Sequence, residues 1–211
     1  MEILFEVSNI KVKSILRIDS LRIYKNKVTC IIGPSGSGKT TFLRLLNKLH
    51  SPDEGKIIYQ GQSLEEIDSV KHRQHVVMLS QKPVMFSKSV YDNLVVGCHF
   101  SNKPIPPKQE LQTLLKQLQV NKEMDDDASL CSIGEKQRIA LARVLLLDPD
   151  VYLMDEPSSA LDQTTERMIV DFIVRKTKEN NKSLIMITHS DDIARKFADK
   201  LITIEKGMIY E

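Results

Sequence analysis

The stretch Gly33-Pro34-Ser35-Gly36-Ser37-Gly38-Lys39-Thr40-Thr41 directly follows the apolar run Val28–Ile32. A strand that ends in a glycine-rich turn and continues into a helix lets main-chain N–H groups converge on an anion, because no side chains block the approach. Lys39 can reach the terminal phosphates, and the hydroxyl of Thr40 at the start of the helix can coordinate Mg²⁺. The stretch therefore predicts a phosphate-binding loop for a nucleoside triphosphate with Mg²⁺.

A pair of acidic residues, Asp155 and Glu156, follows the apolar run Val151–Met154. If that run is a buried strand, both carboxylates lie at its end and face the phosphate loop. Asp155 can then hold Mg²⁺ directly or through water, and Glu156 can orient or deprotonate an attacking water molecule. Two carboxylates also occur at ordinary strand ends, so their combination with the phosphate loop is what favours a catalytic interpretation.

Single polar residues end two further apolar runs. Gln81 follows Val76–Ser80, where its amide can contact Mg²⁺ or water, and His189 follows Leu184–Thr188. Both positions are strand ends that would meet at the same edge of a parallel sheet. A lone histidine more often has a structural role, so His189 by itself would indicate little.

The start of a further helix has two interpretations. Ser132 and Glu135 have the spacing of a capping box ahead of the apolar-periodic residues 139–145. A helix start with a free serine and a glycine, here Ser132 and Gly134, is also a place where an anion can bind. The residues alone leave these interpretations open and equal.

The composition limits the class of protein. The chain has 211 residues, of which 30 are basic and 28 acidic, and its net charge of +2 predicts no broad surface for nucleic acid or anionic lipid. Its three cysteines form no CxxC pair, which argues against a zinc site and a disulfide framework. Apolar runs fall far short of the roughly 20 residues that cross a bilayer, and Met1–Glu6 lacks the basic start of a signal peptide. We expect one soluble, cytoplasmic domain.

Strand-like runs alternate with helical periodicity, which indicates an α/β fold with a parallel sheet covered on both faces. We expect strands at 28–32, 56–59, 76–80, 151–154, 184–188 and 201–205, and helices at 39–48, 90–96, 109–119, 134–147, 164–178 and 191–197. Two N-terminal runs, 5–10 and 16–23, alternate with period two and predict antiparallel strands beside the nucleotide site. Between 82 and 147 helical patterning replaces the strand signal, which predicts a helical insertion.

Six motifs follow one another in the order seen in ATP-binding-cassette (ABC) ATPases, and the resemblance covers essentially the whole chain. They are Gly33–Thr41, Gln81, Ser132–Arg138, Asp155-Glu156, Ser158-Ser159-Ala160-Leu161-Asp162 and His189. The resemblance implies a P-loop NTPase (RecA-like) parallel-sheet core with an antiparallel β N-terminal part and an inserted helical subdomain. Within a single domain of residues 1–211, residues 1–81 and 148–211 would form the nucleotide-binding lobe, and 82–147 the helical signature subdomain.

The same resemblance implies that the chain binds ATP and Mg²⁺ between two cassettes that dimerise head to tail, as a homodimer or a heterodimer. Lys39 and the rest of Gly33–Thr41 would bind the phosphates. The ligands around Mg²⁺ would be Thr40, Gln81 and Asp155, and the catalytic set would be Glu156, which polarises water, His189 at the γ-phosphate, Lys39 and Gln81. Ser132 and Gly134 would bind the opposite subunit's nucleotide, and Asp162 would lie at the dimer interface.

The chain departs from the family pattern in two places. The signature Leu-Ser-Gly-Gly-Gln/Glu reads Cys131-Ser132-Ile133-Gly134-Glu135 here. A β-branched residue resists φ > 0, so Ile133 is harmless only where no glycine conformation is needed, and we expect active but slower hydrolysis. The family also places an aromatic residue that stacks on adenine shortly before the strand at 16–23, and residues 10–13 contain none. Because such stacking contributes about 1–3 kcal/mol, we expect weaker and less base-selective binding, with Ile10 or Val12 as substitute contacts.

The predicted function is that of the ATP-hydrolysing motor subunit of a transporter, which drives a separate membrane permease from the cytoplasm as a peripheral protein at the inner face of the cell membrane. The docking surface would be Gln81–Asn93, although its apolar residues 84–86 could equally pack between the lobes. This segment is similar to phosphate-import ATPases and to small ATPases of two-component exporters.

Three alternatives carry less weight. Soluble ABC ATPases of DNA repair or translation usually carry two cassettes, a long coiled coil or zinc modules, none of which the sequence contains. A kinase or GTPase would require Ser132–Arg138 and His189 to be coincidental. A relative that only binds ATP would fit Ile133 but not the intact Lys39 and Glu156.

Overall fold

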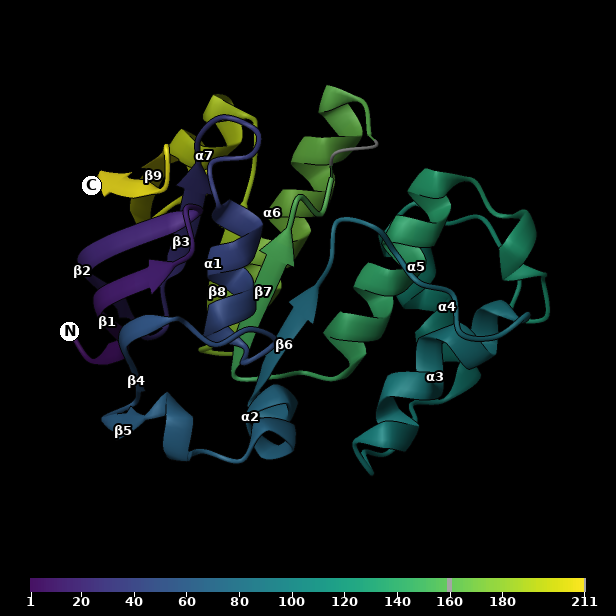
Figure 1. Cartoon of the computed structure of the whole chain (residues 1–211). Coiled ribbons are helices and arrows are strands. Elements are labelled where there is room, and N and C mark those ends of the chain that lie inside the picture. Colours follow the sequence, from purple (N-terminus) through teal and green to yellow (C-terminus); the bar gives the residue numbers. More distant parts are fainter. Residues whose placement is uncertain (159–160, 211) are drawn as a thin grey trace.

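Two β-sheets enclose one helix in the computed structural model, which describes residues 1–158 and 161–210 (Figure 1). The larger sheet has the order β10-β9-β3-β8-β7-β6, in which β10 pairs antiparallel with β9 and the other neighbours pair parallel. Its strands are β3 (Val28–Ile32), β6 (Val76–Leu79), β7 (Val151–Asp155), β8 (Ser183–Ile187), β9 (Lys200–Glu205) and β10 (Met208–Tyr210). The parallel sheet expected from the sequence is confirmed.

The smaller sheet is antiparallel and has the order β2-β1-β4-β5. Its strands are β1 (Ile3–Val12), β2 (Leu16–Tyr24), β4 (Glu54–Tyr59) and β5 (Gln62–Ser63). β1 and β2 pair from Ile3 opposite Tyr24 to Val12 opposite Leu16. Their alternation of buried and exposed residues fits a sheet with one face toward the core and one toward water, so the predicted antiparallel pair is confirmed.

The central strands contribute side chains to two separate cores, because successive residues of a strand point to opposite faces. Val151 and Leu153 of β7 belong to a core shared with β1, β2 and helix α1 (Lys39–Leu46). Tyr152 and Met154 belong to a second core with the helices of the other face. Each face is covered, which explains why β7 and β8 read as continuous apolar runs.

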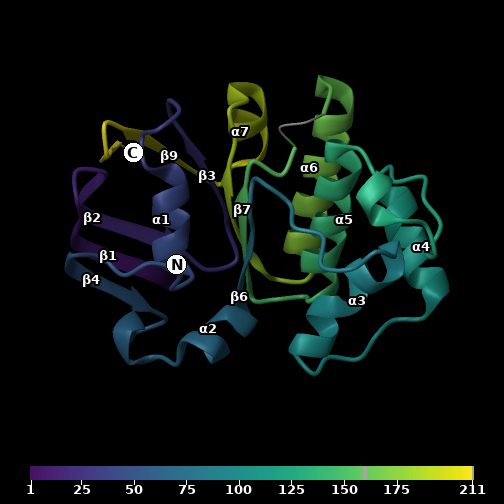
Figure 2. The same ribbon diagram turned by 45° about the vertical axis from the view of Figure 1, so that its right-hand side comes forward.

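Most of the remaining helices cover the second face and extend beyond it, whereas those between β5 and β6 border the first core. They are α2 (Ser69–His75), α3 (Val90–Phe100), α4 (Lys108–Gln117), α5 (Ile133–Leu146), α6 (Gln163–Glu179) and α7 (Asp191–Phe197), with short 3₁₀ helices η1 (Leu64–Glu66) and η2 (Ala128–Leu130). Figure 2 shows α3 and α4 on the side of α5 that faces away from the sheet. Within the described residues, every helix is too short or too polar to span a bilayer.

The expected strands and α-helices are confirmed to within a few residues, and, besides the two 3₁₀ helices, three strands or α-helices come as additions within the described residues. These are α2, β5 and β10, which are short and carry no clear period in the sequence. Between β6 and β7 the named elements are α3, α4, η2 and α5, as the helical patterning of 82–147 predicts. The exact division into lobes at residues 82 and 147 stays a prediction.

α2 anchors the smaller sheet through a buried histidine. His72 is 2% exposed, and its ring contacts the ring of Tyr59 edge-on with centroids 4.9 Å apart. His72 Nε2 lies 2.8 Å from the carbonyl oxygen of Leu46 and donates to it. Burial lowers the pKa of His72, because the charged imidazolium loses its hydration.

We therefore predict that the free energy of unfolding falls as the pH drops below about 6.5, the usual pKa of histidine. There the unfolded chain binds a proton that buried His72 resists, so unfolding is favoured. His72→Gln should flatten this slope in denaturant titrations between pH 5 and 7, whereas the exposed-site control His99→Gln should keep it. Equal slopes in all three proteins would contradict the prediction.

Candidate active site

The predicted phosphate loop connects β3 to α1 at the carboxyl edge of the larger sheet. Gly33 has φ +137°, and a Cβ atom built there would lie 2.0 Å from the carbonyl oxygen of Ile204. Gly38, which precedes the helix, has φ +103°. Both positions therefore need glycine for conformation as well as for space, as the sequence predicts.

The side chain of Lys39 folds back into its own loop. Its Nζ donates hydrogen bonds of 2.8 Å to the carbonyl oxygens of Gly33 and Pro34, and the residue is only 6% exposed. Burial lowers the pKa of Lys39, and the negative charges of Glu156 and Asp155 oppose the shift. The ammonium group therefore lies at the centre of the loop, where its charge can meet phosphate oxygens.

Asp155, at the end of β7, faces the start of α1. Its Oδ2 accepts a 2.9 Å hydrogen bond from Thr40 Oγ1, and the residue is 2% exposed. Burial raises the pKa of Asp155, which the hydrogen bond from Thr40 opposes. Oδ1 is buried and has no hydrogen-bond partner among the described residues.

This arrangement fits Mg²⁺. The unpaired carboxylate oxygen of Asp155 and the hydroxyl of Thr40 beside it are two oxygen ligands that a cation could use. Mg²⁺ in nucleotide sites is usually held by one or two carboxylates together with phosphate oxygens. The described residues contain no group of three or more His, Cys, Asp or Glu side chains that could hold a metal alone. Thr40 and Asp155 would therefore need the ligand's oxygens to complete the coordination.

Glu156 brings two further predicted residues together. Its Oε1 lies 2.6 Å from His189 Nε2, and its Oε2 accepts a 2.8 Å hydrogen bond from Gln81 Nε2. The side chain of Glu156 is 12% exposed and that of His189 is 49% exposed, so the cluster opens to solvent. A carboxylate held by an amide and an imidazole at an accessible edge can accept a proton from water.

The predicted signature residues begin α5. Ser132 Oγ accepts from the N–H of Glu135 at 3.2 Å, and Glu135 Oε2 accepts from the N–H of Ser132 at 2.8 Å. The capping box is confirmed, while the second anion site at Ser132 and Gly134 stays a prediction. In both views β7 lies between α1 and α5, so these two residues are on another side of the molecule from the chain's own phosphate loop (Figures 1 and 2).

Ile133 needs no glycine conformation. It is the first residue of α5, it has no positive φ, and it is 74% exposed. Cys131 is 5% exposed and packs in the core with the helices, as a leucine would. The altered signature is therefore free of backbone strain at position 133, and the expected slower hydrolysis stays a prediction.

Asp162 caps α6, where its Oδ1 accepts from the N–H groups of Thr164 and Thr165 at 3.0 and 3.1 Å. Ser159 and Ala160 of the same motif lie outside the described residues. The proposed role of Asp162 at a dimer interface stays a prediction.

The expected substitutes for the adenine-stacking aromatic residue were chosen wrongly. Ile10 is 0% exposed and Val12 is 9% exposed, because both point into the core beneath the smaller sheet. Ile15, in the turn between β1 and β2, is 41% exposed. Its carbonyl oxygen lies 3.1 Å from a Cβ atom built at Gly38, so this turn adjoins the phosphate loop. The register shift between Ser8 and Lys11, with positive φ at Asn9, turns Ile10 to the same face as Phe5 and Val7, so period-two alternation could not have excluded it.

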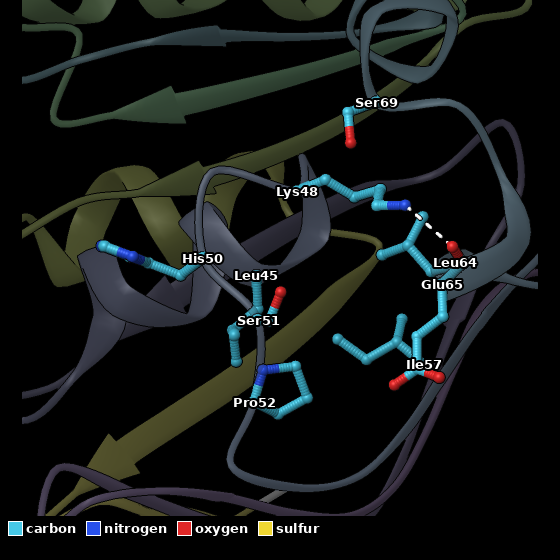
Figure 3. Close-up of a pocket in the computed structure, with 9 residues that line it drawn as sticks. All are labelled: Leu45, Lys48, His50, Ser51, Pro52, Ile57, Leu64, Glu65 and Ser69. Carbon is cyan, nitrogen blue, oxygen red and sulfur yellow. Dashed lines mark hydrogen bonds between the residues drawn. The ribbon is translucent and has the colours of Figure 1, made fainter.

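Another hollow lies apart from these residues (Figure 3). It has a volume of about 390 Å³ and is bounded by the end of α1, β4, η1 and α2. Lys48 Nζ donates to the carbonyl oxygens of Glu65 and Ile67 at its rim, at 3.2 and 2.6 Å. The predicted site residues do not line it.

Comparison with known proteins finds relatives over nearly the whole chain. The family model described as "ABC transporter" matches residues 16–159. "ABC transporter I family member 17" of Arabidopsis thaliana is 36% identical over 198 residues, which are 93% of this chain and 75% of that protein. "Phosphate import ATP-binding protein PstB" of Thermotoga maritima is 33% identical over 228 residues, which cover 100% of this chain and 90% of that protein. The solved structure of a bacterial Atm1-family ABC exporter with ATP bound has a TM-score of 0.89 and 25% identity, and covers 100% of this chain and 38% of the exporter chain.

The exposed Ile15 leads to a prediction about nucleotide selection. An aliphatic contact gives little preference between purines, so ATP and GTP should bind with dissociation constants within about threefold of each other, as equilibrium titration would show. Ile15→Tyr should strengthen ATP binding roughly tenfold by stacking. Val70→Tyr, on exposed α2, is the control and should change neither affinity. A strong preference of the wild type for ATP would contradict this view of the base site.

Proposed function

This chain belongs to the ABC transporter family, and from that membership we propose that it hydrolyses ATP to drive a separate membrane permease. The observation that carries the proposal is the cluster around Glu156, whose carboxylate lies between Gln81 and His189, next to the buried pair of Thr40 and Asp155. ATP hydrolysis needs phosphate binding, metal binding and activation of water at one place. Four neighbouring strands or their loops supply them here.

Each group has a role that its position supports. The main-chain N–H groups of 33–41 and the ammonium of Lys39 would hold the phosphates, and Thr40, Asp155 and Gln81 would hold Mg²⁺, whose charge would offset that of the phosphate oxygens. Glu156 would orient the attacking water and accept its proton, while His189 contacts the carboxylate and would reach the outer phosphate. Because His189 and Gln81 hold separate oxygens of Glu156, they also fix the plane of its carboxylate.

We propose that two cassettes share each ATP, as a homodimer or with a related chain. The start of α5, with Ser132 and Gly134, is free to meet another molecule because it lies away from its own phosphate loop (Figure 2). A helix N-terminus favours anions through its unpaired N–H groups. Leu130, just before this serine, and Ile133, between the serine and the glycine, are 80% and 74% exposed and would become buried by such a partner.

Replacement of Glu156 by glutamine tests the proposed chemistry. Glu156→Gln keeps the hydrogen-bonding shape but cannot take a proton, so we expect ATP turnover to fall by roughly 10²–10⁴-fold with ATP binding retained. ATP should then convert the variant from monomer to dimer in size-exclusion chromatography with light scattering. Glu110→Gln, on exposed α4, should behave as the wild type. A Glu156→Gln protein that stays monomeric with saturating ATP would refute the shared site, and unchanged turnover would refute the role of Glu156.

The permease would dock in an apolar groove beyond Gln81. The groove has a volume of about 280 Å³ and lies between β6, the segment 82–86, α3 and α5. Three large apolar side chains at its rim are strongly exposed, Val84 at 57%, Phe86 at 59% and Phe100 at 76%. Exposed apolar residues that gather along one groove fit a short apolar helix of a membrane protein. We place the chain in the cytoplasm at the inner face of the membrane on this ground.

Arg143 of α5 and buried Asn93 of α3 hold the docking segment in shape. The guanidinium donates to the carbonyl oxygens of Asn93 and Val84 at 2.7 and 3.0 Å, and it lies over the ring of Phe86 at 4.7 Å. Asn93 Nδ2 donates to the carbonyl oxygens of Ser87 and Ser89. Burial lowers the pKa of Arg143 to about 10, which leaves it charged at neutral pH. The exposed rim therefore rests on a rigid frame.

We expect Phe86→Asp to weaken attachment to the membrane. A carboxylate buried in an apolar contact loses its hydration and gains no hydrogen bond in return. The fraction of the protein that sediments with native membranes should therefore drop severalfold. ATP turnover of the purified subunit should stay within about twofold, because Phe86 lies outside the phosphate site. Val70→Asp, also exposed but on α2, should sediment like the wild type. Equal sedimentation of all three proteins would show that this groove is not the docking surface.

A further inference from the structure

The signature helix α5 contacts the main chain of Glu156, the proposed catalytic residue, through a side chain that has no role in the proposed function. Gln137 lies one turn into α5, and its side chain is buried, with 3% of the residue exposed. Its Nε2 donates a hydrogen bond of 2.6 Å to the main-chain carbonyl oxygen of Glu156. The contact joins α5 to the first residue after β7, within the described part of the chain.

The backbone of Glu156 needs such support. Its φ is +53°, in the left-handed region that residues other than glycine seldom occupy. Its N–H donates to the carbonyl oxygen of Ile187 at 3.2 Å, so neighbouring β8 holds one side of the residue. Gln137 holds the other side through the carbonyl. The left-handed conformation changes the direction of the chain directly after Asp155. The side chain of Asp155 therefore contacts Thr40, while that of Glu156 contacts Gln81 and His189.

The direction of the Glu156 side chain follows from this backbone. Its two oxygens reach His189 and Gln81 only while the Cα–Cβ bond points as it does in the left-handed conformation. If the peptide group that Gln137 binds moves, φ and ψ of Glu156 must adjust to it, and a change of φ turns the Cα–Cβ bond and carries the carboxylate away from its partners. A misplacement of about 1 Å at a reacting group can cost 10²-fold in rate.

α5 also carries two other features of the proposed motor. Its first turn holds Ser132 and Gly134, and Arg143, six residues beyond Gln137, holds the docking segment. An α-helix of 14 residues moves as one rigid body over such a short length. A shift of α5 relative to β7 would therefore act on the carbonyl of Glu156 through Gln137.

We propose that Gln137 is a positioning residue that holds Glu156 in its reactive conformation and makes that conformation depend on the placement of α5. The proposal rests on the proposed function, because it assumes that Glu156 acts on water. It assigns Gln137 no contact with ATP. The contact between Gln137 and Glu156 would control the turnover of ATP. It would leave the binding of the nucleotide unchanged.

Gln137→Met tests the proposal, because methionine matches glutamine in length and volume and lacks the donor. With Mg·ATP as substrate, we expect kcat to fall tenfold or more while KM stays within about threefold. Gln112→Met is the matched control: Gln112 Nε2 of α4 donates to the carbonyl oxygen of Lys122 at 2.9 Å, far in sequence from Glu156. This variant loses the same kind of hydrogen bond and should keep the wild-type kcat.

A second measurement separates positioning from a merely structural role. In a Glu156→Gln background, Gln137→Met should leave the ATP concentration for dimerisation unchanged, since binding does not use the carboxylate's proton transfer. Loss of dimerisation, or equal losses of kcat in the Gln112→Met and Gln137→Met proteins, would overturn the proposal. If Gln137→Met fails to fold, Gln137→Asn carries the same test, because it keeps a buried amide and withdraws the donor by one methylene group.

Failure of the proposed function and failure of the proposed role of Gln137 give different results. A wild-type protein that does not hydrolyse ATP would refute the proposed function itself. A wild type that hydrolyses ATP, beside a Gln137→Met variant with unchanged kcat, would refute only the role of Gln137.

Discussion

The parallel alignment of β3, β8, β7 and β6, buried on both faces, is the constraint on which the rest of the structure depends. Because these neighbouring strands point the same way, their carboxyl ends meet at one edge of the sheet. Each then delivers its functional side chains to that edge. The order along the edge is the phosphate loop after β3, His189 after β8, Asp155 and Glu156 after β7, and Gln81 after β6. Residues more than 100 positions apart become neighbours without a long connection of their own.

Features with local causes could be predicted from the sequence. The phosphate loop, the acidic pair and the capping box at Ser132 each depend on a few consecutive residues, and the strands and helices follow from the periods of apolar residues. Ile10 and Val12 are apolar, which made them candidates for the base contact, but both occupy the core face of β1. Ile15 lies beyond the end of β1, in the turn before β2, and its place beside the phosphate loop follows from the packing of that turn against Gly38.

Contacts that depend on how helices pack could not be predicted. Gln137 and Glu156 are 19 residues apart, and Arg143 reaches a carbonyl 59 residues away. Nothing in the composition of α5 distinguishes these side chains from the polar residues on any helix surface. The left-handed backbone of Glu156 has no signal in the sequence either, because glutamate has no preference for that region. The proposed chemistry depends on both.

The internal hydrogen bonds of Lys39 have a consequence for competition between ligands. The Lys39 ammonium already donates hydrogen bonds to two carbonyl oxygens of its own loop. An incoming anion must replace these hydrogen bonds before it can pair with the ammonium charge. A lone inorganic phosphate offers few oxygens and little contact to the surrounding N–H groups, whereas a chain of three phosphates replaces both carbonyls and occupies the whole turn at once. We therefore expect the loop to favour longer polyphosphates over single inorganic anions.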